Sequence, residues 1–137
     1  MLLEDKIKTF FKDKEEVIAV YLFGSYAYGK SKPFSDIDIG IIIDESFLHR
    51  PIDYRDRYLV QLSKILRKDI HPVILNYAGE ELHRQIFSKG KCILINNGKK
   101  LTEYKMIMYA KIAEFGYYKS IIQEGFTKKI TEDLKID

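Results

Sequence analysis

The chain has 137 residues and a formal net charge of +3, so it is long enough to form one domain with a core of its own. Hydrophobic residues make up 46% and charged residues 31%, which is the balance of a globular protein and excludes a disordered chain. Charges of both signs are interspersed, whereas a nucleic-acid-binding protein of this size usually carries a basic stripe. We therefore do not expect direct nucleic-acid binding.

The single Cys92 excludes an internal disulfide and a cysteine-rich metal site, and its apolar surroundings, KCILIN, predict a buried thiol. The chain opens with MLLEDKIKTFFKDKEE, which is charged within four residues and unlike a secretory leader. Its longest nearly uncharged apolar run, VIAVYLFG, is far shorter than the roughly 20 residues of a membrane span. We expect a cytoplasmic protein that makes no membrane contact.

The first part of the chain predicts a helix and two strands. Apolar residues recur at helical spacing between charged ones over 2–14, which predicts an amphipathic helix. The β-branched and aromatic run 17–23 is short and stops at Gly24, as a buried strand does. The stretch after Gly24 has room for about two helical turns before Pro33. The run DIDIGIIID, over 36–44, predicts the second strand.

The middle of the chain predicts a helix over 51–68 and a strand over 69–75. Pro51 suits the first turn of the helix, since proline needs no hydrogen-bond partner there. Pro72 interrupts the ladder of the strand, which indicates an edge strand or a bulge. The predicted apolar side of the helix consists of Tyr54, Tyr58, Leu62 and Ile65.

The last part predicts a helix over 79–90, a short strand over 91–95 and a long helix from Leu101 to about Gln123. The alternation of helices and strands predicts an α/β domain with one small mixed sheet of about four strands, flanked by helices. On the long helix, one apolar stripe has the spacing of core residues, and its continuation leaves room for a partner surface. The stripe is Tyr104, Met108, Ile112 and Phe115, and the continuation is Ile121, Ile122 and Phe126.

Two aspartates stand at the start of the second predicted strand. Side chains at positions i and i+2 of a strand point to the same face, so Asp36 and Asp38 present two carboxylates side by side. Two like charges there repel and resist desolvation unless a cation lies between them. Mg²⁺ takes carboxylate and phosphate oxygens as ligands, so the pair predicts a metal clamp for a nucleoside triphosphate.

A Gly-Ser pair ends the first predicted strand. Backbone N–H groups at a strand end that leads into a helix bind anions, and Gly24 lets phosphates approach the backbone closely. The Ser25 hydroxyl can donate to a terminal phosphate. Together with the two aspartates, this arrangement predicts in-line displacement at phosphorus.

The stretch GSYAYGKSKPFSDID, a Gly-Ser pair, ten residues and Asp-x-Asp, resembles the signature of the DNA polymerase β-like nucleotidyltransferase superfamily. Length and layout are similar to its minimal nucleotidyltransferases, the MNT-domain proteins. The segment VILNYAGEELHRQIFSKGKCIL also resembles the family, including its basic-Gly-basic turn. The resemblance implies a nucleotidyltransferase fold over 1–137, with a core at 17–95 and a C-terminal helical extension at 101–137.

The resemblance also implies Mg²⁺ as cofactor and ATP as substrate. Carried over by position, Gly24 and Ser25 match the phosphate-binding pair, and Asp36 and Asp38 match the metal ligands. Gly29 and Ser35 match positions that shape the nucleotide-binding loop.

One position departs from the family pattern. The family has a third carboxylate five residues before the position of Asn76, where this chain has His71. Asp69 lies two residues earlier and replaces it if Pro72 shifts the register. Otherwise His71 takes the place of the general base, or the third carboxylate is lost and the enzyme is slow or inactive.

Many MNT proteins are antitoxins paired with a HEPN-domain ribonuclease toxin, which they modify by transferring AMP to a tyrosine. The resemblance therefore implies a protein AMP-transferase whose partner is a HEPN-type toxin. Two alternatives stay open: an inactive antitoxin that acts by sequestration, and a small-molecule transferase of the aminoglycoside-modifying kind. The acceptor, the preferred base and the oligomeric state, a homo-oligomer included, are left open by the sequence.

Overall fold

The computed structural model describes residues 2–24 and 36–134, and of residues 126, 127 and 129–134 it describes the backbone alone. Its four strands form one mixed sheet in the order β3-β2-β1-β4, in which β1 is antiparallel to β2 and β4, and β2 is parallel to β3. The predicted α/β class is confirmed. The strands are β1 (Val17–Phe23), β2 (Ile37–Ile43), β3 (Ile70–Ile74) and β4 (Lys91–Ile95).

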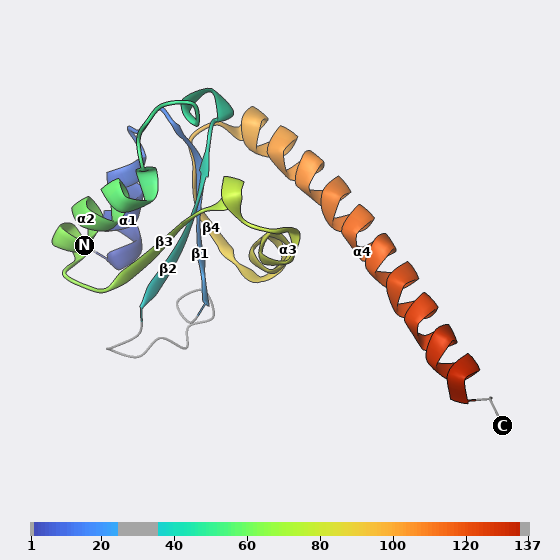
Figure 1. Ribbon diagram of the computed structural model, residues 1–137. Helices are drawn as coiled ribbons and strands as arrows, with labels where there is room; N and C mark the ends of the chain where they lie inside the picture. The colour runs from blue at the N-terminus through green and yellow to red at the C-terminus, as the bar shows by residue number, and fades with distance from the viewer. Residues whose placement is uncertain (1, 25–35, 135–137) are drawn as a thin grey trace.

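Helices cover both faces of the sheet, with α1 and α2 on one face and α3 and α4 on the other (Figure 1). The helices are α1 (Leu3–Phe11), α2 (Tyr54–Leu66), α3 (Glu80–Lys89) and α4 (Gly98–Leu134), and two short 3₁₀ helices are η2 (Glu45–Phe47) and η3 (Leu75–Tyr77).

The face under α1 and α2 is a continuous apolar layer. Along β2, every second residue from Ile37 to Ile43 is fully buried against it, because alternate side chains of a strand point to the same side. The hydroxyl of buried Tyr58 donates to Glu16 Oε1 at 2.8 Å, which satisfies the one polar atom that the ring brings into this layer.

Helix α2 differs from the prediction at both ends. It begins after Asp53, whose side chain accepts from the Asp56 N–H at 3.1 Å, so Pro51 precedes the helix instead of starting it. Tyr54, Tyr58 and Leu62 are buried as expected, but Leu66 completes the row and Ile65 is 47% exposed. The buried row keeps a strict spacing of four residues, which passes over position 65.

The opposite face is covered more sparingly, by α3 and the first part of α4. Its buried cluster includes Ile42 of β2, Ile86 of α3 and Leu101 of α4. Fully buried His83 joins the two helices: its Nδ1–H donates to the Gly79 carbonyl at 2.9 Å, and Nε2 lies 2.6 Å from the Tyr104 hydroxyl. His83 is a structural residue, whereas His49 is exposed.

Asn76 of η3 attaches the chain after β3 to the end of β2. Its Oδ1 accepts from the Ile43 N–H and its Nδ2 donates to the Ile43 carbonyl, both at 2.8 Å. The amide thus substitutes for a neighbouring strand at the point where β3 has ended.

β3 and β4 are the two edges of the sheet. The Asp69 carbonyl accepts from the Ile37 N–H at 3.1 Å, so every second residue after it faces β2, and Pro72 faces the outer edge. Pro72 therefore marks an edge strand without a bulge. On β4, Cys92 is exposed, and the predicted buried thiol is wrong because an edge strand leaves this side chain uncovered.

Helix α4 is longer than predicted, with 37 residues from Gly98 to Leu134. At 1.5 Å per residue it is about 55 Å long, and its second part extends past α3 (Figure 1). Among the described residues, no helix is both long and apolar enough to cross a membrane.

Candidate active site

The paired aspartates lie where the helical cover of the sheet ends. Asp36 is exposed just before β2, and Asp38 lies on β2 with its side chain 27% exposed. Because these positions differ by two, both belong to the face covered by α3 and α4. At this end of the strands the carboxylates remain open to solvent and to ligands.

His71 stands beside Asp38. The parallel register aligns the two residues, and His71 Nδ1 lies 3.1 Å from Asp38 Oδ1. The imidazole is 57% exposed, so the pair is at the rim of the site. The sequence had indicated both residues separately, but their contact depends on the pairing of strands 33 residues apart.

Asp69 lies immediately before β3 and is exposed. The register between β2 and β3 is uninterrupted from Ile37 and Ile70 onward, so Pro72 causes no shift. The condition under which Asp69 replaces the third carboxylate is therefore not met, and His71 is the residue aligned with Asp38.

Gly24 lies against the Asp38 carboxylate. Its φ of +68° is in the left-handed region, which favours glycine, and a Cβ at this position would overlap Asp38 Oδ2. The closeness follows from the pairing of Phe23 with Asp38 between β1 and β2. Gly24 has no side chain, so the backbone at the end of β1 comes into contact with the Asp38 carboxylate. A backbone segment that binds phosphate next to a metal site needs this closeness.

Three predicted site residues, Ser25, Gly29 and Ser35, lie outside the described residues, as do Tyr26, Tyr28 and the short helix predicted after Gly24. The described part of the predicted site comprises Gly24, Asp36, Asp38, Asp69 and His71.

The donor atoms suit a hard divalent cation with few protein ligands. Asp36 and Asp38 supply carboxylate oxygens, and Mg²⁺ commonly takes one or two carboxylates together with water and phosphate oxygens. No group of three or more His, Cys, Asp or Glu residues within 2–24 and 36–134 has the arrangement of a metal site. Two carboxylates of this kind suit an ion that takes its other ligands from water or phosphate.

Two tyrosines, Tyr21 and Tyr104, pack in the apolar cluster on this face of the sheet. Burial raises the pKa of both Tyr21 and Tyr104 above the usual value of 10, so these phenols remain neutral at physiological pH.

The surface next to His71 is hollowed. A groove of about 780 Å³ runs along the outer edge of β3, and its wall begins at Pro72, the residue after His71. Loop and helix residues form its other walls, among them Ile52, Tyr54, Tyr77 and Leu82.

A mixed sheet that carries paired carboxylates beside a glycine-ended strand defines a class of enzymes that act on nucleotides. Residues 5–99 match the family model described as "Polymerase beta, Nucleotidyltransferase". The chain is also 37% identical over 83 residues to a putative protein adenylyltransferase of Methanocaldococcus jannaschii. The aligned region covers 56% of this chain and 83% of the relative. The chain therefore belongs to the polymerase beta nucleotidyltransferase family.

Solved structures have the same fold. A toxin–antitoxin structure with AMP-PNP matches with a TM-score of 0.67 and 23% identity, over 95% of this chain and 99% of the other. A complex of a tri-AMPylated HEPN toxin with its MNT antitoxin from Shewanella oneidensis matches with a TM-score of 0.60 and 21% identity, over 93% and 95%.

Proposed function

We propose that this chain transfers AMP from ATP to a hydroxyl group of a partner protein, and that it is the antitoxin of a pair whose toxin is a HEPN-type ribonuclease. The observation that carries the proposal is the Asp36–Asp38 pair beside Gly24, in a chain of this family. The relative named as a protein adenylyltransferase supports a protein acceptor, and the matched toxin–antitoxin complexes support a toxin as that acceptor.

In the proposed reaction, the acceptor oxygen forms a bond to the α-phosphorus of ATP, and the bond to the β-phosphate breaks. AMP remains on the acceptor, pyrophosphate leaves, and the hydroxyl proton goes to a base of the enzyme. Asp36 and Asp38 would hold Mg²⁺, which would neutralise phosphate charge. Gly24 and Ser25 bind the β- and γ-phosphates, and Gly29 and Ser35 shape the loop between these groups.

The strand order supports a direction of approach for the acceptor. Gly24 follows β1, the aspartates belong to β2 and His71 to β3, and these strands are neighbours in that order. If Gly24 binds the phosphates and the aspartates hold the metal, the β3 side, with His71 and Asp69, remains for the acceptor. The groove along β3 lies on that side. His71, which contacts Asp38, is the first candidate for the base that removes the hydroxyl proton. Exposed Asp69 is the second candidate.

We also propose that residues 1–137 act as one nucleotidyltransferase domain in the cytoplasm, where ATP is available. We propose to seek the partner first among the products of adjoining genes.

The test incubates the chain and the protein encoded by the adjoining gene with Mg²⁺ and ATP labelled at the α-phosphate. Label is followed on protein after denaturing electrophoresis. We expect label on the partner, lost in Asp38→Asn because a neutral amide is a poor Mg²⁺ ligand. Asp56→Asn, an exposed change of the same kind on α2, is the control and retains the label.

A stable complex without label, in the wild-type chain, would contradict AMP transfer and indicate sequestration. Label on a low-molecular-weight acceptor alone would indicate a small-molecule transferase instead. His71→Asp restores the family's third carboxylate. We expect this variant to retain transfer, whereas His71→Ala loses most of it, and equal activity in both variants would exclude a role for this position.

A further inference from the structure

The outer edge of β3 has backbone groups that point away from the sheet. Among the described strands, β3 has a neighbour on one side only. Because the Asp69 carbonyl accepts from the Ile37 N–H, alternate residues of β3 bond to β2, and those between them point outward. Along the groove, the outward groups include the Pro72 carbonyl and the Ile74 N–H. Pro72 itself contributes no N–H.

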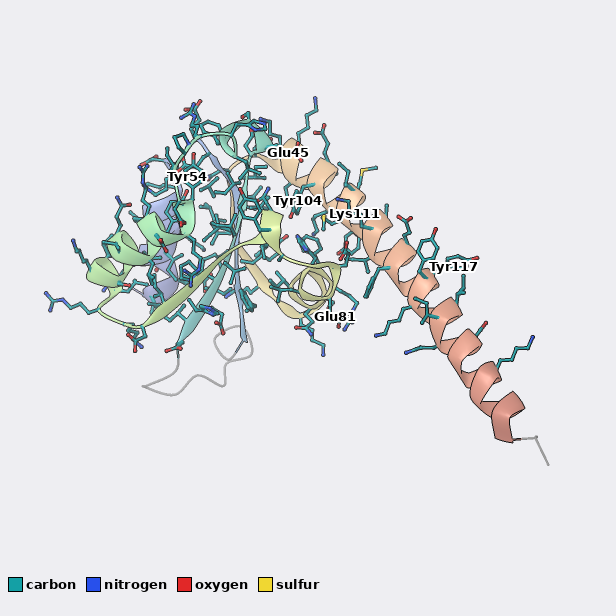
Figure 2. All side chains as sticks on the ribbon, viewed as in Figure 1. Glu45, Tyr54, Glu81, Tyr104, Lys111 and Tyr117 are labelled. Atoms are coloured by element: carbon teal, nitrogen blue, oxygen red, sulfur yellow. The ribbon has the colours of Figure 1, made fainter. Side chains whose placement is uncertain are left out.

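Both layers of the molecule form the walls of this groove. Ile52 and Tyr54 line it from the side of α2. Tyr77 of η3 and Leu82 of α3 line it from the other side. Figure 2 shows Tyr54 at the start of α2 and Glu81 at the start of α3, on the two faces of the sheet. Since alternate side chains of a strand point to opposite faces, a strand added along β3 would contact both walls.

Pro72 favours one direction for an added strand. In an antiparallel pair, one residue exchanges both backbone hydrogen bonds with the residue opposite, and Pro72 can make only one of them. In a parallel pair, one residue donates to a carbonyl of the edge and accepts from the N–H two residues later. The Pro72 carbonyl and the Ile74 N–H have that spacing. The middle of this edge therefore suits a parallel strand.

The parallel direction determines which added side chain lies beside the candidate site. The residue held between Pro72 and Ile74 would be aligned with Val73, and the residue two positions before it with His71. His71 is itself aligned with Asp38. All these side chains belong to the same face, and neighbouring strands are about 4.8 Å apart. A hydroxyl group at the earlier position would thus extend the row of Asp38 and His71 by one strand.

We propose that the AMP-accepting segment of the partner binds along β3 as an added parallel strand. The residue with the accepting hydroxyl lies two positions before the residue that Pro72 and Ile74 hold. This inference rests on the proposed function and defines how the acceptor is oriented in the same site. Binding by strand addition obtains affinity from main-chain hydrogen bonds and specificity from pockets for alternate side chains.

The position of the groove favours the acceptor as its occupant. The groove begins at Pro72, directly after His71, so a strand that lies in it continues to the candidate site. The molecule whose reacting group must reach that site is the one that supplies the hydroxyl. Its oxygen bonds to the α-phosphorus of ATP as pyrophosphate leaves, and its proton goes to His71 on the neighbouring strand.

The first experiment removes the outward N–H of the edge. Ile74→Pro does so and fits the backbone, because φ of Ile74 is −80° and proline holds φ at roughly −65°. Ile74→Ala is the reference, since both variants lose the buried isoleucine side chain but alanine keeps the N–H. The KM for the protein encoded by the adjoining gene and the KM for ATP are measured in the AMP-transfer assay. Circular dichroism checks that both variants are folded.

We expect the KM for the partner to be roughly two- to tenfold higher in Ile74→Pro than in Ile74→Ala, as for the loss of one hydrogen bond. The KM for ATP should be the same in both variants, because the proposed phosphate-binding residues follow β1. Equal values of the KM for the partner in the two folded variants would overturn the inference.

The second experiment changes the partner and leaves this chain intact, so it does not depend on the folding of an Ile74 variant. The labelled residue of the partner is first located by mass spectrometry. Proline is then placed two positions after it in one variant and three positions after it in another. The first proline removes the N–H that donates to the Pro72 carbonyl, whereas the second removes an N–H that points away from β3. Only the first should raise the KM, and an equal effect of both would contradict the parallel register.

Two further outcomes have a separate meaning. Self-association of the chain alone, measured by sedimentation, could be lost in Ile74→Pro and kept in Ile74→Ala while the KM for the partner is the same in both. That result would overturn the inference and assign the β3 edge to a second copy. Absence of label with the wild-type chain would instead reject the proposed function.

Discussion

The two faces of the sheet use the same strands in different ways. On the face of α1 and α2, fully buried isoleucines of β2 pack along the whole strand from Ile37 to Ile43. On the other face, the residues in between change from Asp38 through Gly40 to buried Ile42. One face is thus apolar to both ends, and the other is apolar at one end and polar at the other.

The difference indicates how a small domain accommodates a charged site. The continuous face supplies the hydrophobic burial, about 25 cal/mol per Å², that stabilises the fold. The second face then needs only α3 and the first part of α4, and it leaves one end of β2 open for carboxylates. Substitutions on the first face should change stability, and those at the open end should change activity.

The largest expected effect is on the first face. Leu62→Ala removes a fully buried side chain of α2 and should lower the free energy of unfolding by about 2–5 kcal/mol. Ile65→Ala, on the exposed side of the same helix, should change it by no more than about 0.5 kcal/mol. Urea denaturation measures both, and equal losses would show that the two positions are not on opposite sides of α2.

At the open end, Gly24→Ala should affect activity. The new Cβ overlaps the Asp38 carboxylate, and φ of +68° disfavours alanine, so the carboxylate must move. A displacement of about 1 Å can cost on the order of 10²-fold in kcat, or about 2.7 kcal/mol. Gly98→Ala, where a Cβ meets no atom within 4 Å, is the matched control in the AMP-transfer assay. Retained activity in Gly24→Ala would argue against the proposed role of this contact.

A smaller loss of stability is expected where β3 ends. Asn76→Asp keeps the acceptor for the Ile43 N–H but places an oxygen against the Ile43 carbonyl, which should cost about 1–3 kcal/mol. Asn97→Asp is the control, because Asn97 Oδ1 only accepts, from the Lys100 N–H at 3.1 Å near the start of α4. Thermal unfolding compares the two, and a stable Asn76→Asp variant would contradict a structural role for the amide donor.

The smallest effect concerns the ion pair that joins the end of β2 to α4. Lys100 Nζ contacts Asp44 Oδ2, and this contact, with the Ser46 N–H and hydroxyl, holds the pKa of Asp44 below its usual 3.8. A carboxyl pKa that is lower in the folded state stabilises the fold above about pH 4, and this contribution is lost as the pH falls through the lower, folded-state pKa.

Lys100→Met should therefore lower stability by less than about 1 kcal/mol at pH 7, since Lys100 is 47% exposed. The difference from the wild-type chain should be smaller at pH 2, because protonation of the carboxyl removes the ion pair. Urea denaturation at the two pH values measures it, and a difference independent of pH would exclude the ion pair as its cause.

Local patterns predicted most of the elements. The strand 17–23 has the predicted bounds because its β-branched run is flanked by charge and by glycine. Gly24, Asp36 and Asp38 were indicated by spacing alone, and the pairing of Phe23 with Asp38 brings Gly24 to the Asp38 carboxylate. Gly24, Asp36 and Asp38 thus lie in one short segment of the sequence, which is why local spacing indicated them.

The errors, and the alternatives that the sequence left open, involve contacts between distant segments. Whether His71 or Asp69 aligns with Asp38 depends on the register of β2 and β3, which a single sequence does not contain. Cys92 is exposed because β4 is an edge, and the strand order decides that. Leu66 replaces Ile65 in the core because packing selects one of two helical spacings that the pattern allows equally.

Pro72 has a consequence for the behaviour of the molecule in concentrated solution. An edge strand offers unpaired N–H and C=O groups to any other strand, and β3 is such an edge beside the residues proposed to be catalytic. At Pro72 the outward position lacks an N–H, which interrupts the row in the middle of five residues. This edge can therefore stay open to the proposed acceptor while offering a poorer template for aggregation.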